Sequence, residues 1–219
     1  MTIDRENLLN SILDSLGRIQ HISADDIPNI DLYMDQVTTF MEKRLRSTTR
    51  NPAEDKILTK TMINNYAKND LLPPPVRKKY SKEHMLLLIF IYYYKGILSI
   101  GDIQTLLKPL TERYFHVGNG PSLSEIYEEV FSLEKEEISG LKEDIIKKFS
   151  ASQKTFQEAP EKDREILQLF SFISMLSYDV YVKKLLIEKM IDSFQSATAR
   201  EKQRPSPDRK EKSGKEPRK

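Results

Sequence analysis

Apolar side chains recur at the spacing of amphipathic helices along most of this chain. Residues 4–21 and 31–46 each carry one apolar stripe, which predicts two helices. A third helix is expected over residues 59–69, because the hydroxyl of Thr59 can accept a hydrogen bond from the first turn. Three prolines at 73–75 lack the backbone donor that a helix needs, so this helix ends before them.

The next apolar stretch is continuous instead of periodic. Residues 85–94 are apolar or aromatic at every position, which predicts a helix that begins near Ser81 and is buried on most sides. Ser99 and Asp102 suit the start of one more short helix. Residues 76–80, between the prolines and the buried helix, contain three consecutive cations and leave room for only a minimal β wing.

Glycine and proline at positions 118–121 interrupt the pattern and indicate a domain boundary. Ser122 and Glu125 have the spacing of a capping box, so a new helix is expected at once. We therefore predict an N-terminal part over residues 1–117 and a C-terminal helical part over residues 121–199.

A long helix is expected after Pro160. Apolar residues recur in it at heptad spacing over nearly five repeats, with more apolar side chains beside the seam. The pattern predicts a thick dimer interface or packing in a bundle, and it leaves open whether two copies or one chain make the contact. The expected dimerisation seam is formed by Ile166, Leu169, Ile173, Leu176, Val180, Ile187 and Met190.

The last residues, 200–219, have a different composition. Nine basic and four acidic side chains with no aliphatic residue cannot build a core, so we expect a disordered basic tail. Such a tail suits weak attraction to DNA or anionic surfaces, and it equally suits a solubilising role.

Composition narrows the classes of protein. The chain has 219 residues and only seven glycines, which argues against a β sandwich. It has no cysteine, which excludes disulfides and thiolate metal sites. The longest apolar run is about half of the roughly 20 residues that a membrane helix needs, and no signal peptide is recognisable, so we expect a cytoplasmic protein without membrane contact. No catalytic motif or histidine pair at metal-ligand spacing occurs, so we expect neither an enzyme nor a cofactor.

The net charge is only +2, but the charges are unevenly distributed. Residues 56–95 contain eight basic against two acidic side chains, whereas residues 121–165 contain seven basic against twelve acidic ones. A basic segment set apart from an acidic body is typical of proteins that bind nucleic acid.

The order of short helix, proline turn, basic wing, buried helix and short helix resembles the winged helix-turn-helix of MerR-type transcription regulators. The matching pieces are Asn-Asn-Tyr at 64–66, Asp-Leu-Leu-Pro at 70–73, the basic stretch 77–81, Leu88, Phe90 and Ile91, and the pattern Ser99, Ile103, Leu106, Leu107. The stretch also resembles an uncharacterised bacterial domain family that carries a MerR-like reader. The resemblance implies an all-α fold with a winged reader over about residues 31–107, followed by a helical region that dimerises or senses an effector.

Within this resemblance, the helix after Thr59 is the recognition helix. Asparagine pairs well with adenine in the major groove, whereas lysine and arginine contact phosphates without reading sequence. For Tyr66 the resemblance implies a phosphate contact or a packing role. The alternative is that the asparagines are merely solvated and the cations form an ordinary charged face. The residues expected to contact DNA are Lys60, Thr61, Asn64, Asn65, Tyr66, Lys68, Arg77, Lys78 and Lys79.

Two aromatic groups are candidates for a ligand pocket. The three tyrosines at 92–94 could form an aromatic cage, although on a buried helix such residues more often pack. A cluster in the long helix could line a cavity for an apolar effector, or it could simply be bundle core. This second cluster consists of Phe170, Phe172, Met175 and Tyr178.

Together these patterns predict a DNA-binding transcription regulator that acts as a homodimer. Its expected partners are double-stranded DNA and a second copy of the chain, with an unknown small molecule or protein as the effector. The competing hypothesis is a helical protein–protein interaction scaffold without specific DNA binding. It is supported by the acidic segment 121–165, by the short wing, and by the Asn-Asn pair at 64–65, where the MerR-type pattern has Arg-Tyr.

Overall fold

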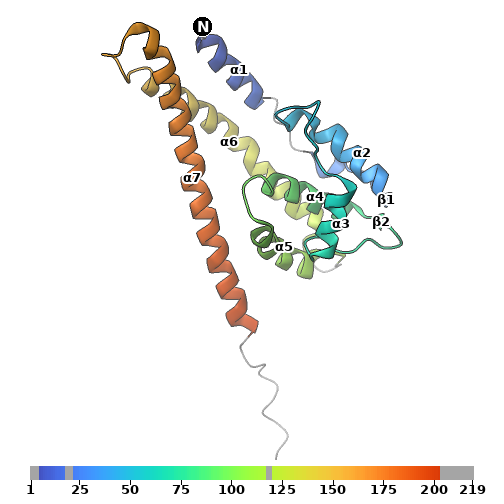
Figure 1. Cartoon of the computed structure of the whole chain (residues 1–219). Coiled ribbons are helices and arrows are strands. Elements are labelled where there is room, and N and C mark those ends of the chain that lie inside the picture. The colour runs from blue at the N-terminus through green and yellow to red at the C-terminus, as the bar shows by residue number, and fades with distance from the viewer. Residues whose placement is uncertain (1–4, 18–21, 117–119, 203–219) are drawn as a thin grey trace, which may run out of the picture.

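The computed structural model describes residues 5–17, 22–116 and 120–202. Within these ranges the chain is mostly helical with a long C-terminal helix, as predicted, and it has one small two-stranded sheet (Figure 1). The elements in chain order are α1 (Arg5–Gly17), the short 3₁₀ helix η1 (Ala24–Asp26), β1 (Leu32–Tyr33), α2 (Met34–Leu45), the 3₁₀ helix η2 (Arg46–Thr48), α3 (Lys60–Lys68), β2 (Lys79–Tyr80), α4 (Lys82–Tyr94), α5 (Ile100–Tyr114), α6 (Leu123–Ser152) and α7 (Glu161–Lys202).

Helix α4 forms the centre of the fold. Every side chain from His84 to Ile91 is at most 2% exposed, as the continuous apolar run predicts. At its start, the backbone N–H of Ser81 donates a hydrogen bond to Nδ1 of His84 at 3.0 Å. Helices α5 and α6 and strand β2 pack around α4, so this helix is enclosed on most of its sides.

The start of α2 differs from the prediction of a helix over residues 31–46. Leu32 and Tyr33 form β1, which pairs antiparallel with β2 so that Leu32 lies opposite Tyr80. The pairing buries both of these side chains, at 5% and 2% exposure. Helix α2 therefore begins only at Met34, and the Gln36 side chain accepts a hydrogen bond from the N–H of Tyr33 at 2.9 Å. A long-range strand pairing has replaced the first helical turn that the local pattern favoured.

One hydrophobic core extends from Ile22 to Phe131 and also takes in Ile191 of α7. The hydroxyl of Tyr127 in α6 donates to the carbonyl of Ile22 at 2.5 Å, and the rings of Phe90 and Phe131 stack with centroids 5.4 Å apart. The first turns of α6 thus pack with the N-terminal elements. The division of the chain at residues 118–121 stays a prediction.

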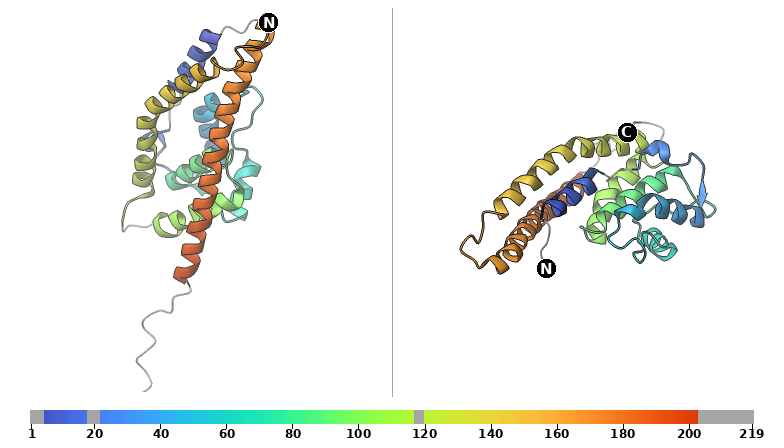
Figure 2. Two further views of the ribbon diagram at one scale, coloured as in Figure 1. Left: turned by 90° about the vertical axis from the view of Figure 1, so that its left-hand side faces the viewer. Right: turned by 90° about the horizontal axis from the view of Figure 1, so that it is seen from above.

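Helices α6 and α7 form a hairpin whose two arms diverge from the turn (Figure 2). Near the turn, the ring of Phe149 packs edge-on against Phe172, with centroids 5.4 Å apart. The amide of Gln168 donates to the carbonyls of Gln153 and Thr155 at 2.8 and 3.0 Å. Farther along, α7 contacts α5, while α1 lies against α6. The hairpin is therefore joined to the core along part of each arm.

The C-terminal end of α7 also differs from the prediction. Residues 200–202, expected in a disordered tail, continue the helix, since arginine, glutamate and lysine are all good helix formers. Residues 203–219 of the expected tail lie outside the described residues.

No helix in the described ranges combines the length and the hydrophobicity needed to cross a bilayer. The most apolar helix, α4, has 13 residues. At 1.5 Å per residue it is about 20 Å long, against roughly 30 Å of hydrocarbon. Its hydrophobicity is accounted for by the protein core.

Candidate functional site

Helix α3 presents one polar face to solvent. As predicted, Thr59 caps it, because its hydroxyl accepts a hydrogen bond from the N–H of Met62 at 3.2 Å. Ile63 and Tyr66 face the core at 0% and 8% exposure, which turns the opposite side of the helix outward. At 100° per residue the exposed positions fall within an arc of about 140°. They are Lys60, Thr61, Asn64, Asn65 and Lys68.

The C-terminal end of α3 is held by backbone hydrogen bonds. Asp70 adopts the left-handed conformation with φ of 53°, which aspartate tolerates better than most residues. The N–H groups of Leu71 and Leu72 then both donate to the carbonyl of Tyr66, at 2.9 and 3.2 Å. The side chain of Gln104 in α5 donates a hydrogen bond to the carbonyl of Asn69, the C-cap residue of α3, at 3.0 Å. These contacts fix the direction in which the chain leaves α3.

A two-residue turn carries the cations of the predicted wing. Val76 and Lys79 exchange two backbone hydrogen bonds, at 3.1 and 2.9 Å, and Arg77 and Lys78 lie between them with φ of 51° and 65°. Turns of this kind favour asparagine and glycine, because other side chains in the left-handed region cost about 1 kcal/mol or more each. Backbone strain clusters at functional sites, which makes this turn a candidate for one.

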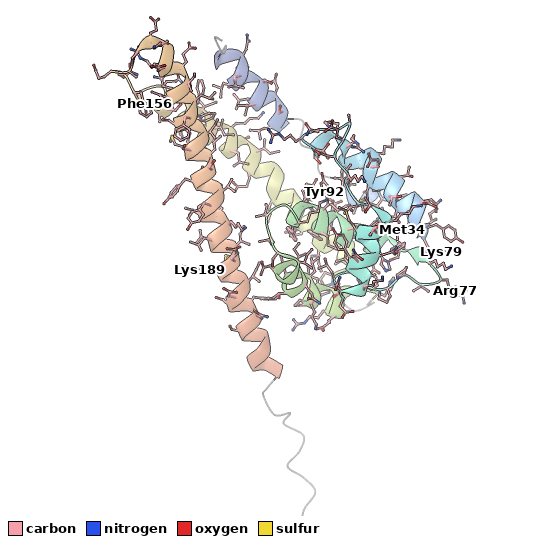
Figure 3. All side chains as sticks on the ribbon, in the orientation of Figure 1. Met34, Arg77, Lys79, Tyr92, Phe156 and Lys189 are labelled. Carbon is pink, nitrogen blue, oxygen red and sulfur yellow. The ribbon has the colours of Figure 1, made fainter. Side chains whose placement is uncertain are left out.

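The side chains of this turn are accessible. Arg77 and Lys78 are exposed, and Figure 3 shows Arg77 and Lys79 at the edge of the molecule away from α7. Lys79 is half-buried, and its ammonium lies 5.3 Å from the ring centroid of Tyr33 on the paired strand. The strand pairing thus positions one cation while the other two project from the turn.

The polar face of α3 and the turn share a positive charge. Residues 60–80 contain five cations and one carboxylate, that of Asp70. Lys60 forms an ion pair with Asp35 in the first turn of α2. Such exposed pairs contribute at most about 1 kcal/mol, so Lys60 can exchange this partner for another anion at little cost. The local charge favours a negatively charged binding partner.

Eight of the nine residues predicted to contact DNA lie on the exposed face of α3 or in the turn and strand that follow it. Tyr66 is the exception, because its side chain is buried in the core and burial raises the pKa of its hydroxyl. Of the two roles that the resemblance implied for Tyr66, its burial agrees with packing.

The predicted dimerisation seam does not lie in one environment. Ile187 packs against the core of its own chain. The half-buried seam residues are Leu169, Leu176 and Ile187, whereas the exposed ones are Ile166, Ile173, Val180 and Met190. The apolar face that α7 turns outward runs instead along Ile166, Phe170, Ile173, Val180 and Tyr181, each at least 52% exposed. We call these five residues the outer face of α7.

The two aromatic candidates have different outcomes. Phe172 is buried against α6, whereas Phe170 and Tyr178 are 64% and 68% exposed, so that cluster encloses no common cavity. Tyr92 and Tyr93, by contrast, line a pocket of about 730 Å³ between α1, the connection from α2 to α3, and the end of α4. The sequence singled out these tyrosines but not the other walls of the pocket, which come from segments that are distant along the chain. Among the described residues no group of three metal-ligating side chains occurs.

Comparison with known families gives one match. Residues 22–130 match the family model described as "Domain of unknown function (DUF1836)". The matched range coincides with the N-terminal core, from Ile22 to the first turns of α6, and leaves out most of the α6–α7 hairpin. The match agrees with the predicted resemblance to an uncharacterised domain family, but it gives no support for the MerR-like reader within that resemblance. No curated protein and no solved structure matched the chain.

Proposed function

We propose that this protein is a DNA-binding transcription regulator that acts as a homodimer and contacts DNA through α3 and the Val76–Lys79 turn. One observation carries the proposal. The five exposed residues of α3 form a polar face that contains no apolar side chain, and the turn that follows has a strained backbone and two exposed cations. A core-packed helix with such a face is suited to the major groove, which is wide enough to admit an α-helix.

The proposal assigns different tasks to the side chains. Asn64 and Asn65 would read base edges, since an amide pairs with both N6 and N7 of adenine. Lys68, Arg77 and Lys78 would neutralise phosphates and fix the protein on the duplex. The resemblance of this segment to a winged helix-turn-helix supports the same assignment, with α2 as the supporting helix and the turn as the wing.

The homodimer is supported by the outer face of α7. Its five side chains, with Tyr178 and Leu185 at its flanks, are 39–68% exposed in the isolated chain. At roughly 100 Å² each they would bury about 700 Å² per copy, close to the roughly 800 Å² per partner of a standard interface. In a twofold-symmetric dimer the second copy presents the same face, so each apolar surface covers the other.

A fluorescence-anisotropy titration with duplexes from the source genome, at two salt concentrations and with selection of the bound fraction, tests the proposal. We expect one inverted-repeat motif to be enriched and to remain bound at the higher salt. Binding should weaken with a log–log slope of about −0.9 per phosphate neutralised. Replacing Arg77 and Lys78 by alanine should then make the slope shallower by about 1.8.

Base reading requires its own variant. Asn65→Ala should weaken binding to the selected motif more than binding to random duplex, whereas Asn29→Ala, on an exposed loop distant in sequence from α3, should change neither. An equal loss on both duplexes would remove the base-reading role. Binding that disappears at the higher salt without an enriched motif would contradict the regulator and favour the helical interaction scaffold.

A further inference from the structure

The pocket beside α4 has walls of two kinds. Ile12 and Leu16 of α1 line it together with Tyr92 and Tyr93 of α4, and hydroxyl and charged groups form the rest of the lining (Tyr92 is labelled in Figure 3). Its volume of about 730 Å³ lies within the range of small-molecule sites. A concave site that combines apolar and aromatic side chains with placed polar groups is the usual form of a ligand pocket.

One charged group is built into this border. The Lys95 ammonium is half-buried, donates a hydrogen bond to the carbonyl of Ile57 at 2.6 Å, and lies 5.0 Å from the ring centroid of Tyr92. An ammonium has three N–H donors, so others remain for a further acceptor. Burial lowers the pKa of Lys95, and an anion placed beside it would stabilise the charged form.

The wall formed by the α2–α3 connection is held in place. The guanidinium of Arg46 donates to the carbonyl of Asp55 at 2.7 Å. The hydroxyls of Thr48 and Tyr92 are hydrogen-bonded at 2.6 Å, which fixes the edge of the aromatic ring. These contacts hold this wall and the Tyr92 ring in place, so little ordering of this part of the pocket is needed when a ligand binds.

The charges around the pocket select the sign of the ligand. The lining contains two cations, Lys95 and Lys56, and one carboxylate, Asp55. The Asp55 carboxylate already accepts a hydrogen bond from the N–H of Asn51 at 2.9 Å. The ring of Tyr92 that would attract a ligand cation is already occupied by Lys95. A cationic ligand would therefore meet like charge, whereas an anion would meet an available donor.

We propose that this pocket binds a small organic anion with a flat apolar body. The negative group pairs with Lys95, and the body lies between the aliphatic side chains of α1 and the rings of Tyr92 and Tyr93. The proposal concerns a site separate from α3 and the turn, so it stands or fails independently of DNA binding.

Three probes of one shape test the sign of the ligand: 2-naphthoate, the neutral 2-naphthamide and the cationic 2-naphthylmethylammonium. Binding to the full-length chain is measured by ligand-observed and protein-observed NMR titration. For fragments of this size we expect a Kd on the order of 1 mM or tighter for the anion, and binding about 10-fold weaker for the amide and the cation. Equal or tighter binding of the amide or the cation, or no saturable binding of naphthoate, would overturn the proposal.

Variants place the binding at Lys95. Lys95→Met should weaken naphthoate binding about 10-fold and leave the amide unchanged, and Lys95→Arg should restore most of the loss. The matched control is Lys189→Met, an exposed lysine of α7 that should have no effect. If Lys95→Met does not fold, the three-probe comparison on the unmodified chain together with Lys95→Arg still decides. Equal loss in Lys95→Met and Lys189→Met would contradict the site.

Discussion

The core around α4 and the α6–α7 hairpin differ in how far they bury their apolar side chains. In α4, eight consecutive side chains are at most 2% exposed, whereas the five residues of the outer face of α7 are all at least 52% exposed. The core is complete within one chain. The hairpin contacts the core along part of each arm and leaves the outer face of α7 exposed. The first region thus buries its apolar residues within the chain, whereas the second exposes one apolar face to solvent.

The largest expected effect compares the same substitution in both regions. Ile89→Ala in α4 should lower the free energy of unfolding by about 2–5 kcal/mol, because it leaves a cavity in a closely packed core. Ile173→Ala on α7 should lower it by less than about 0.5 kcal/mol at protein concentrations where the chain is monomeric. Chemical denaturation of both variants gives the two values. Similar losses would mean that Ile173 is buried within the chain.

A second test uses the one titratable side chain buried in α4. Desolvation lowers the pKa of His84 from 6.5 to about 4, and its Nδ1 accepts a hydrogen bond only when unprotonated. The unfolded chain therefore takes up this proton at higher pH than the folded one. Stability should be full above about pH 6.5 and should fall as the pH drops toward 4, by about 3 kcal/mol in all.

Unfolding measured between pH 7 and pH 4 checks this expectation. His84→Gln should flatten the dependence, whereas His116→Gln, on the exposed histidine nearby, should leave most of it. If the free energy of unfolding of His84→Gln depends on pH as it does in the unmodified chain, the acid sensitivity arises from groups other than the buried histidine of α4.

A third test asks whether the outer face of α7 meets a second copy. Ile173→Asp should weaken self-association at least 10-fold, since it places a carboxylate in an apolar interface. Ile97→Asp, an equally exposed isoleucine between α4 and α5 (46% against 52%), is the matched control and should leave the association unchanged. Sedimentation velocity over a concentration series measures both. A monomer at all concentrations before substitution would refute the homodimer.

The smallest expected effect concerns the Val76–Lys79 turn, whose backbone is strained at Arg77 and Lys78 although the core beside it is well packed. Replacing Arg77-Lys78 by Asn-Gly should raise the free energy of unfolding by about 1 kcal/mol, because both residues suit positive φ. The same change should weaken DNA binding if the cations contact phosphates. A variant that gains stability and keeps full affinity for DNA would show that the turn is structural only.

Local signals in the sequence predicted local structure well. The apolar run of α4, the Thr59 cap, the helix start at Ser99 and the capping box that begins with Ser122 were all predicted, and each depends on residues that are close in sequence. The polar residues of α3 were likewise singled out. A helix boundary of this kind follows from hydrogen bonds that the sequence places side by side.

Features that depend on distant segments were not predicted. Leu32 carries the apolar spacing of a helix, yet its backbone pairs with Tyr80 nearly fifty residues later. The heptad residues of α7 do not share one environment, because Ile187 packs against the core of its own chain while others are exposed. The heptad repeat in the sequence does not show which of its residues contact the core. The tyrosines of the pocket at Tyr92 were candidates from the sequence, but its other walls were not predicted, since α1 and the α2–α3 connection come together only in the folded chain.

The length of α7 also sets the size of the particle in solution. Its 42 residues span about 63 Å at 1.5 Å per residue, and a uniform rod of that length alone has a radius of gyration of about 18 Å. A compact domain of 219 residues would have about 17 Å in total. The helix alone is therefore as extended as a compact chain of this size, and we expect the protein to migrate as a larger object than its 25.5 kDa suggests.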